Sequence, residues 1–477
     1  MRRLFLIGLI PVFAVACGRN TGTSTTPAPT IAITAPGEGA TILGSRSVAV
    51  TGTVTGTGLS VSVRANGGAA VAATVSGETF SAHVTLRDRA NTIVATATNS
   101  AGSATDTIDV SYPFLTLTTF QAAERVIGQA DKTSWDVNRG GAVGAGTVNA
   151  PYGSAAWDGT RLFLPDSGNN RLLAFAGVPA VDGAAADFAV GQADLTTSAA
   201  AVSAAGLQAP MTVRIADGKL FVTEWWSEDP PVNRLLIRDA VPTAAGGAAT
   251  VVVGAEGLDQ AGTGACDAES LSQVQSFFVV GTRLIVADAG HNRVLIWNTI
   301  PTQSGVTPDV VLGQSSFTAC DPNAGGAASL STLSYPTDVW SDGTRLYVAD
   351  LENGRILGWN TIPTTTRAAD FVLGAIETFS MSPYMITSNG NQLFVADLFN
   401  YRVLVWNSLP TSAAAPDVVL GQRTLSGITP NDDNQDDAQD ANPTARTLNW
   451  PTGVTVLPDA LVVTDNSNNR FLVFRGQ

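Results

Sequence analysis

The 477-residue chain is long enough for about three domains of roughly 150 residues each, and its charge argues against nucleic acid as a partner. Asp and Glu number 40 against 26 Lys and Arg, which gives a formal net charge of −14. A protein that binds phosphate backbones or anionic lipid through a basic patch needs clustered positive charge. The two histidines, His83 and His291, are also too few for a multi-histidine metal site.

The first residues predict export. A positively charged start and an apolar run over residues 4–16 are typical of a signal peptide comprising residues 1–16, and the run is too short for a permanent membrane-spanning helix. Either an ordinary signal peptidase cleaves before Cys17, or Cys17 becomes a lipidated N-terminus. The second alternative resembles the bacterial lipobox, although Ala14 stands where Leu is usual. We favour lipidation of Cys17, because cleavage alone would leave an unpaired terminal thiol.

Lipidation implies attachment to a membrane through the lipid anchor. Gly18, rather than Asp, follows the cysteine, which resembles outer-membrane sorting, so we expect an exported outer-membrane lipoprotein on either the periplasmic or the cell-surface side. Residues 17–29 are rich in Thr, Gly and Pro and predict a flexible tether behind the lipidated Cys. Cys266 and Cys320 remain, and an exported chain permits a disulfide between them; two separate thiols are the alternative.

Residues 30–112 predict a β-sandwich. Stretches such as SVAVTGTV and NTIVATATN alternate small and β-branched residues with a period of two, and Gly, Asn or Pro separates them at short intervals. Together they resemble the bacterial Ig-like domains that act as surface stalks, without the Cys–Trp–Cys core of antibody domains. We expect His83, within one of these strands, to be a half-buried structural residue rather than a ligand.

From about residue 120 onward the chain repeats itself six times at roughly 60-residue intervals. Each unit has an apolar run ending in Gly, a Pro-led strand (Ser276 takes the place of Pro in the third unit), and a strand that ends in an acidic residue, followed by a turn and an Arg. The acidic residue and the arginine of the six units are Asp166 and Arg171, Glu224 and Arg234, Asp288 and Arg293, Asp350 and Arg355, Asp397 and Arg402, and Asp465 and Arg470.

Four strands per unit, repeated six times, predict a β-propeller. The last unit ends after its third strand, and a spare strand at 124–128 precedes the first unit, so pairing the two would close the ring without an open edge. The VAD…N-x-R-V-x-x-W pattern over 120–477 resembles the NHL repeat family. That resemblance implies an all-β fold with a six-bladed, NHL- or TolB-like propeller after the Ig-like sandwich, and it implies no particular activity.

The Asp…Arg pairs are interpreted as structural, because they occur in every unit whereas a catalytic site on a propeller normally breaks the symmetry. The second unit departs from the repeat, with extra residues in its turn that include Trp225, Trp226, Glu228 and Asp229. Two adjacent Trp in a long turn cannot both face one side of a strand, so at least one is a candidate for sugar or protein contacts. The alternative is a Trp pair packed beneath a loop.

Two further features suggest ligands. Aromatic residues at the starts of the Pro-led strands form a possible rim around the channel mouth, which binds glycan or peptide or else only fills space. These candidates are Tyr152, Tyr335, Tyr384 and Trp450. In the longest connection, Asp432, Asn434 and Asp436 alternate as in calcium loops, but the Gly and Glu of such loops are missing, and a solvated acidic loop is the alternative.

The sequence therefore favours a non-catalytic surface lipoprotein whose propeller binds a protein or a polysaccharide. No catalytic residue is named, and calcium is the one cofactor considered. The competing interpretation is a metal-dependent enzyme at the propeller mouth that resembles lactonases or lyases, which would need several carboxylates or histidines converging on one metal.

Overall fold

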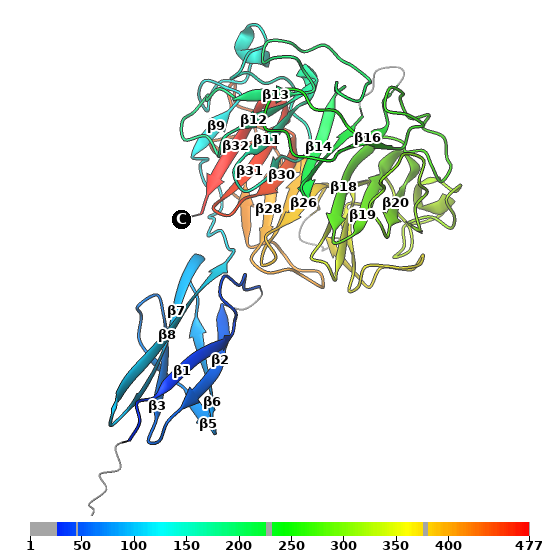
Figure 1. Cartoon of the computed structure of the whole chain (residues 1–477). Helices are drawn as coiled ribbons and strands as arrows, with labels where there is room; N and C mark the ends of the chain where they lie inside the picture. Colours follow the sequence, from blue (N-terminus) through cyan, green and yellow to red (C-terminus); the bar gives the residue numbers. More distant parts are fainter. Residues whose placement is uncertain (1–25, 44–45, 226–230, 375–379, 477) are drawn as a thin grey trace, which may run out of the picture. The chain divides into compact units, whose positions relative to one another are not determined.

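The computed structural model describes residues 26–43, 46–225, 231–374 and 380–476 (Figure 1). Within these ranges the regular structure is β-strand with short 3-10 turns, and none of the described helices has the length and apolar character needed to cross a membrane. The chain divides into two compact units. Of the described residues, unit 1 holds 26–40 and 46–111, and unit 2 holds the rest.

Unit 1 contains two four-stranded sheets. The first has the order β1 (Thr30–Ala35), β2 (Ser47–Thr55), β6 (Thr79–Thr85) and β5 (Thr74–Ser76), and the second has the order β4 (Val71–Ala72), β3 (Ser60–Ala65), β7 (Arg89–Asn99) and β8 (Gly102–Tyr112). Alternate residues of the longer strands β2, β3, β6 and β7 are buried, as Phe80 and Val84 of β6 illustrate, whereas β4 and β5 are exposed. His83 is exposed, because it has the opposite parity in β6; the expectation of a half-buried histidine is wrong.

Unit 2 contains six antiparallel four-stranded sheets, numbered here in chain order. Sheet 1 is β10 (Ala156–Trp157), β11 (Leu162–Asp166), β12 (Arg171–Phe175) and β13 (Phe188–Val190); sheet 2 is β14 (Pro210–Ala216), β15 (Lys219–Glu224), β16 (Arg234–Arg238) and β17 (Val251–Val253). Sheet 3 is β18 (Val274–Val280), β19 (Arg283–Asp288), β20 (Arg293–Trp297) and β21 (Val310–Leu312); sheet 4 is β22 (Pro336–Ser341), β23 (Leu346–Asp350), β24 (Arg355–Trp359) and β25 (Phe371–Gly374). Sheet 5 is β26 (Pro383–Ser388), β27 (Leu393–Asp397), β28 (Arg402–Trp406) and β29 (Val418–Leu420); sheet 6 is β30 (Pro451–Val456), β31 (Ala460–Asp465), β32 (Arg470–Arg475) and β9 (Arg125–Ile127).

The sheets form a ring. First strands of successive sheets contact one another from β14 through β18, β22 and β26 to β30, and β14 also contacts β10 and β11 of sheet 1. Sheet 6 returns to sheet 1, where Thr464 Oγ1 donates to the carbonyl of Gly153 at 2.7 Å and Ser154 Oγ donates to that of Val454 at 3.2 Å. The hydrophobic core lies between neighbouring sheets. This architecture is a β-propeller.

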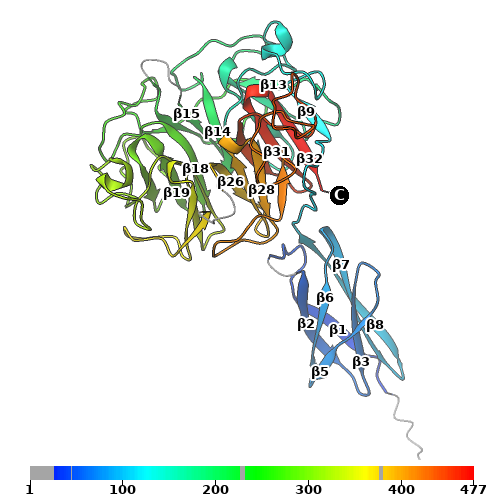
Figure 2. The ribbon, with the colours of Figure 1, turned by 180° about the vertical axis from the view of Figure 1, so that it is seen from behind.

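Strand β9 completes the last sheet although it lies more than 300 residues away in sequence. It pairs antiparallel with β32, with Val126 opposite Leu472 (Figure 2). Without β9 the backbone edge of β32 would be open to water or to another chain. The pairing places β9, which precedes sheet 1 in the chain, beside the last strand, β32, in one sheet.

A buried ion pair anchors the end of each sheet. In all six sheets the arginine Nε donates to the acidic side chain across 2.6–2.8 Å. In sheet 6, Arg470 also donates to the carbonyls of Lys132 and Thr447 at 2.5 and 3.0 Å, and Asp465 accepts the N–H of Asn449 at 2.7 Å. The guanidinium therefore ties its own sheet to the connections on both sides, which satisfies the charge in a water-free site.

A second repeated bond joins neighbouring sheets. In four sheets an Asn in the left-handed region follows the turn between the second and third strands, and its Oδ1 accepts the N–H of the residue that precedes the next sheet's first strand at 2.7–2.8 Å. These pairs are Asn170 with Ala209, Asn233 with Gln273, Asn292 with Tyr335, and Asn469 with Ala150. Asn tolerates this backbone better than most residues. Sheets 4 and 5 carry Gly354 and Tyr401 at the same position.

The ion pair between Asp465 and Arg470, in the sheet that closes the ring, yields a stability prediction. Arg470→Ala leaves Asp465 buried without its partner, and we expect a loss of about 3–5 kcal/mol in the free energy of unfolding of unit 2. Arg345→Ala is the matched control, because Arg345 pairs with Asp342 at the surface at 2.8 Å and such pairs contribute less than about 1 kcal/mol. Denaturant unfolding of the full chain measures both. Equal losses in the two variants would contradict the structural role of the buried pair.

Candidate binding surface

Side chains from four sheets meet at the centre of the ring. Gln275 of β18 accepts a hydrogen bond from the Tyr384 hydroxyl of β26 and donates to the Tyr335 hydroxyl at 3.1 Å. The Tyr152 ring of sheet 1 packs edge-on against Tyr384, with centroids 5.6 Å apart. Thr212 of β14 donates to the backbone carbonyl of Gln275 at 3.1 Å. Sheets 1 and 5, and sheets 3 and 5, are not neighbours in the ring, so these contacts cross its middle.

A second contact crosses the ring between sheets 2 and 4. Arg214 Nη2 donates to Asp338 Oδ1 at 3.2 Å, and its guanidinium lies 5.1 Å from the centroid of the Phe278 ring. The other Asp338 oxygen accepts the N–H of Ile386 at 2.7 Å, and Oδ1 also accepts the N–H of Val339 at 2.8 Å. The carboxylate of Asp338 is fully buried and its oxygens are engaged by donors of the protein.

Burial keeps these central groups in their neutral or paired forms. It raises the pKa of Tyr335 to about 12, with further contributions from Tyr152 and Glu352, and it raises the pKa of Tyr384 well above its ordinary value. Burial also raises the pKa of Asp338, an effect that the Arg214 guanidinium opposes. A phenol with so high a pKa is no base or nucleophile at neutral pH. The central cluster therefore keeps its phenols protonated at neutral pH and joins sheets across the ring.

The four predicted rim aromatics do not form one set. Tyr152 and Tyr384 follow the first-strand Pro and point into the central cluster, whereas Tyr335 and Trp450 precede it, with φ of 52° and 57°. Tyr335 still reaches Gln275, but Trp450 is 38% exposed and stacks edge-on against Phe399, with centroids 6.0 Å apart. Tyr335 and Trp450 lie just before their strands in left-handed backbone, so the alternation of side chains along a strand does not fix their direction, and grouping all four aromatics as one rim is wrong.

The predicted tryptophan turn is only partly described. Trp225 is half-buried and packs against the hydrophobic cluster between sheets 2 and 3. For this one residue the arrangement is that of the alternative interpretation, in which the Trp pair is packed rather than exposed. Trp226, Glu228 and Asp229 lie outside the described residues, as does Cys17.

The predicted calcium loop is folded onto its own backbone. The Asp432 carboxylate is buried and accepts the N–H groups of Asp436 and Asp437 at 3.2 and 3.0 Å, and Asn434 donates its amide to Asp436 at 3.2 Å. Across the residues that the structure describes, three or more His, Cys, Asp or Glu side chains nowhere gather in a way that would hold a metal ion. These three side chains act as loop-forming groups in this arrangement.

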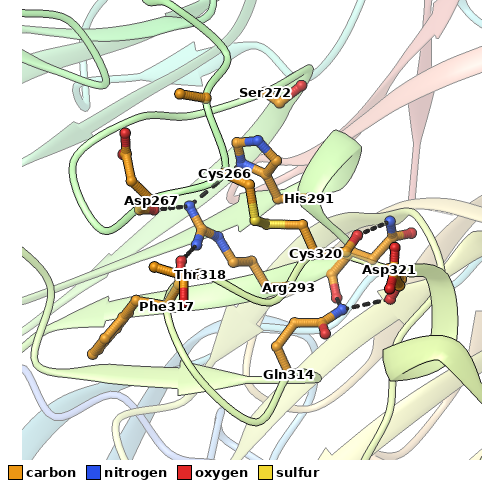
Figure 3. The surroundings of a disulfide bond; sticks show 12 residues. Cys266, Asp267, Ser272, His291, Arg293, Gln314, Phe317, Thr318, Cys320 and Asp321 are labelled. Atoms are coloured by element: carbon orange, nitrogen blue, oxygen red, sulfur yellow. Dashed lines mark hydrogen bonds between the residues drawn. A yellow bond between two sulfur atoms is a disulfide. The ribbon is translucent and has the colours of Figure 1, made fainter.

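The predicted disulfide is confirmed. Cys266 and Cys320, separated by 54 residues in sequence, are bonded and join the connections on either side of sheet 3 (Figure 3). Arg293 lies beside the bond and donates to the carbonyls of Asp267, at 2.7 Å, and Phe317, one in each of these connections. Asn292 donates to the Cys320 carbonyl at 2.9 Å. The disulfide therefore reinforces a link that the buried ion pair already makes.

Three participants were missed from sequence: Gln275, Arg214 and Phe399. Gln275 was missed because Ser276 was taken as the equivalent of the Pro in the third unit; Val274 is the residue paired opposite Asp288, as Pro336 is opposite Asp350. That misalignment by two residues placed Phe277 at the strand start. Arg214 is recognisable from the sequence, because it is the one basic residue among the described residues of the six first strands.

Comparisons with known proteins add no family. No protein-family model and no curated protein matches the sequence. Among solved structures the chain is similar to streptogramin B lyase, with 11% identity, 69% of this chain and 94% of that chain covered, and a TM-score of 0.36. It is similar to the PQQ-bound aldose sugar dehydrogenase of Streptomyces coelicolor (13%, 72% and 98%, TM-score 0.38) and to BamB of Moraxella catarrhalis (14%, 76% and 99%, TM-score 0.35). The propeller assignment rests on the strand pairing and ring contacts above.

Removing the disulfide tests its contribution. In loop-closure terms a bond across 54 residues contributes about 4 kcal/mol. For a unit of this size that corresponds to a fall of about 5 °C in the thermal unfolding temperature of the Cys266→Ser, Cys320→Ser double variant. Differential scanning calorimetry of the full chain measures it, and reduction of the unmodified chain is expected to give the same shift. An unchanged melting temperature would show that the ion pair alone holds these connections.

Proposed function

We propose that this protein is a non-catalytic binding module for a protein or polysaccharide, held at the cell envelope. The observation that carries the proposal is the closed centre, where bonded side chains join sheets that are not neighbours. Asp338 is the one carboxylate among the described residues of the six first strands, and it forms an ion pair with Arg214. A metal-dependent lactonase- or lyase-like reaction would need several such groups turned toward one open site.

The finer architecture belongs to the same proposal. We interpret unit 2 as a six-bladed propeller of the NHL type in which each sheet is one blade, supported by the recurring acidic–Arg pair and by β9 as the closing strand. We interpret unit 1 as an Ig-like stalk, supported by its two four-stranded sheets and alternating burial. Such a stalk would raise the propeller from a membrane surface.

The proposed location is the outer membrane, through a lipid on Cys17. The bonded Cys266–Cys320 pair supports export, because disulfides form and persist in oxidising compartments. Several acyl chains give firm anchoring where one gives only marginal binding.

Metabolic labelling tests the anchor. We expect radiolabelled palmitate to be incorporated into the full chain expressed in a Gram-negative host, and the chain to fractionate with outer membranes. Cys17→Ser should abolish both, because it removes the acylated sulfur, while Cys320→Ser should leave labelling unchanged. Label retained in the Cys17→Ser variant would exclude lipidation at this residue.

The binding role is tested against the enzyme alternative. We expect the full chain to bind a purified envelope polysaccharide or protein with an affinity that does not change on dialysis against a chelator, because no described site gathers metal ligands. The same preparation is assayed with a panel of lactones and uronic-acid polymers. Turnover that requires added metal and is lost in Asp338→Asn would overturn the proposal in favour of the enzyme.

A further inference from the structure

One pair of aromatic side chains stands out on the connection face, defined here as the end of the ring that carries the turns between second and third strands and the connections between sheets. Phe399, in the turn between β27 and β28, is 48% exposed, and Trp450, just before β30, is 38% exposed. Their rings meet at an interplanar angle of 84°. Because the two rings are nearly perpendicular and both are exposed, they form a corner open to solvent, called here the Phe399–Trp450 corner.

The pair breaks the repeat at both positions. The residue equivalent to Phe399, two places after the acidic residue, is small in sheets 1, 3 and 6, where it is Gly168, Gly290 and Ser467. The residue equivalent to Trp450 is Ala in sheets 1 and 2, Gln273 in sheet 3, Tyr335 in sheet 4 and Ser382 in sheet 5, so an exposed Trp is not part of the repeat. Since smaller side chains serve the fold at these positions elsewhere in the same ring, the architecture does not require the two aromatics.

The backbone adds a cost at the same place. Trp450 and Tyr401 both adopt the left-handed region, with φ of 57° and 52°, where bulky residues are uncommon. In four other sheets the position of Tyr401 is filled by the Asn whose side-chain amide oxygen binds the next sheet. Tyr401 has no side-chain amide, so it cannot make that bond at the junction of sheets 5 and 6. The fold imposes this backbone elsewhere in the ring too, since Ala150, Ala209, Gln273 and Tyr335 also have positive φ, so the unusual feature here is the bulky side chains placed on it.

The connection face as a whole is acidic. Glu352, exposed in the corresponding turn of sheet 4, lies close enough to the central cluster for its charge to act on Tyr335. The described turns and connections of this face carry 14 acidic and four basic residues. The acidic residues are Asp131, Asp136, Asp194, Glu256, Asp259, Asp267, Glu269, Asp321, Glu352, Asp432, Asp433, Asp436, Asp437 and Asp440, and the basic residues are Lys132, Arg139, Arg423 and Arg446.

We propose that the Phe399–Trp450 corner binds an Arg or Lys side chain from a basic segment of a protein partner. The proposal rests on the binding role proposed above and specifies its site and ligand class. Ring faces carry negative potential and attract cations. The acidic face raises the local concentration of a basic partner and speeds its approach. Polysaccharide is the less favoured ligand, because sugar rings stack on flat aromatic faces and the second ring here stands upright against the first.

The test uses variants that copy residues from the other sheets, so that the fold is preserved. Phe399→Ser copies Ser467, and Trp450→Ala copies Ala150. The probe is a fluorescein-labelled peptide of alternating Arg and Gly, titrated with the full chain. We expect each variant to weaken binding about five-fold, as the loss of a cation–π contact does. Neither substitution changes the net charge. A loss of affinity therefore measures the contribution of the two aromatic rings rather than long-range electrostatic attraction.

Two controls separate the corner from the rest of the face. Trp135→Ala removes another exposed Trp, 44% exposed in the first connection, and should leave affinity within two-fold of the unmodified chain. A peptide with Gln in place of Arg should bind at least ten-fold more weakly. Calorimetric melting of each variant checks that the ring is intact.

Four outcomes would overturn the inference. Unaltered peptide affinity in both Phe399→Ser and Trp450→Ala, or equally tight binding of the Gln peptide, would show that the corner does not bind a cation. Dextran or β-1,3-glucan binding that Trp450→Ala abolishes would make polysaccharide the ligand and would leave the proposed binding role standing. A chain that binds neither peptide nor polysaccharide, yet turns over a lactone, would remove the proposed function as well.

Discussion

The buried acidic–Arg pair is the interaction on which the propeller depends. A charge placed between sheets loses its hydration and is tolerated only when each of its hydrogen-bonding groups finds a partner. In sheet 6 the arginine obtains these partners from the connections on both sides. Lys132 lies in the connection that follows β9, and Thr447 lies in the connection that precedes β30. The need to satisfy the guanidinium therefore organises loops that have no regular structure of their own. The disulfide adds a covalent link at the one sheet where two cysteines flank this pair.

The six repeats provide an internal reference for what the fold requires. Where an Asn side chain binds the next sheet, as Asn469 binds Ala150 at the ring closure, the residue serves the architecture. Where the same position holds Tyr401, and its neighbour across the junction is Trp450, the architecture has been altered locally. The centre is asymmetric as well, but there the unique side chains Arg214, Asp338 and Gln275 bond to one another or to neighbouring side chains, whereas Phe399 and Trp450 are exposed. A closed centre with an altered rim is the expected distribution for a module that binds at its surface.

Much of this could be predicted from sequence because it is written in local, repeated patterns. The propeller follows from strand periodicity and from an acidic residue and an Arg at nearly constant spacing. The disulfide follows from the count of cysteines in a chain that is expected to be exported. Two errors had different causes: His83 was expected to be half-buried although its parity in the strand exposes it, and Ser276 was aligned two positions late in its repeat, which hid Gln275.

The sequence by itself determined which segments form strands, how many units repeat and which cysteines bond, since each of these depends on residues near one another or on simple counting. Only the tertiary structure decided that Arg214 meets Asp338, that Tyr152 meets Tyr384 and that Trp450 turns away from them toward Phe399. These contacts join sheets more than 50 residues apart in the chain, and closing the ring brings them together. Side chains that meet across a ring leave no periodic signal in any one strand.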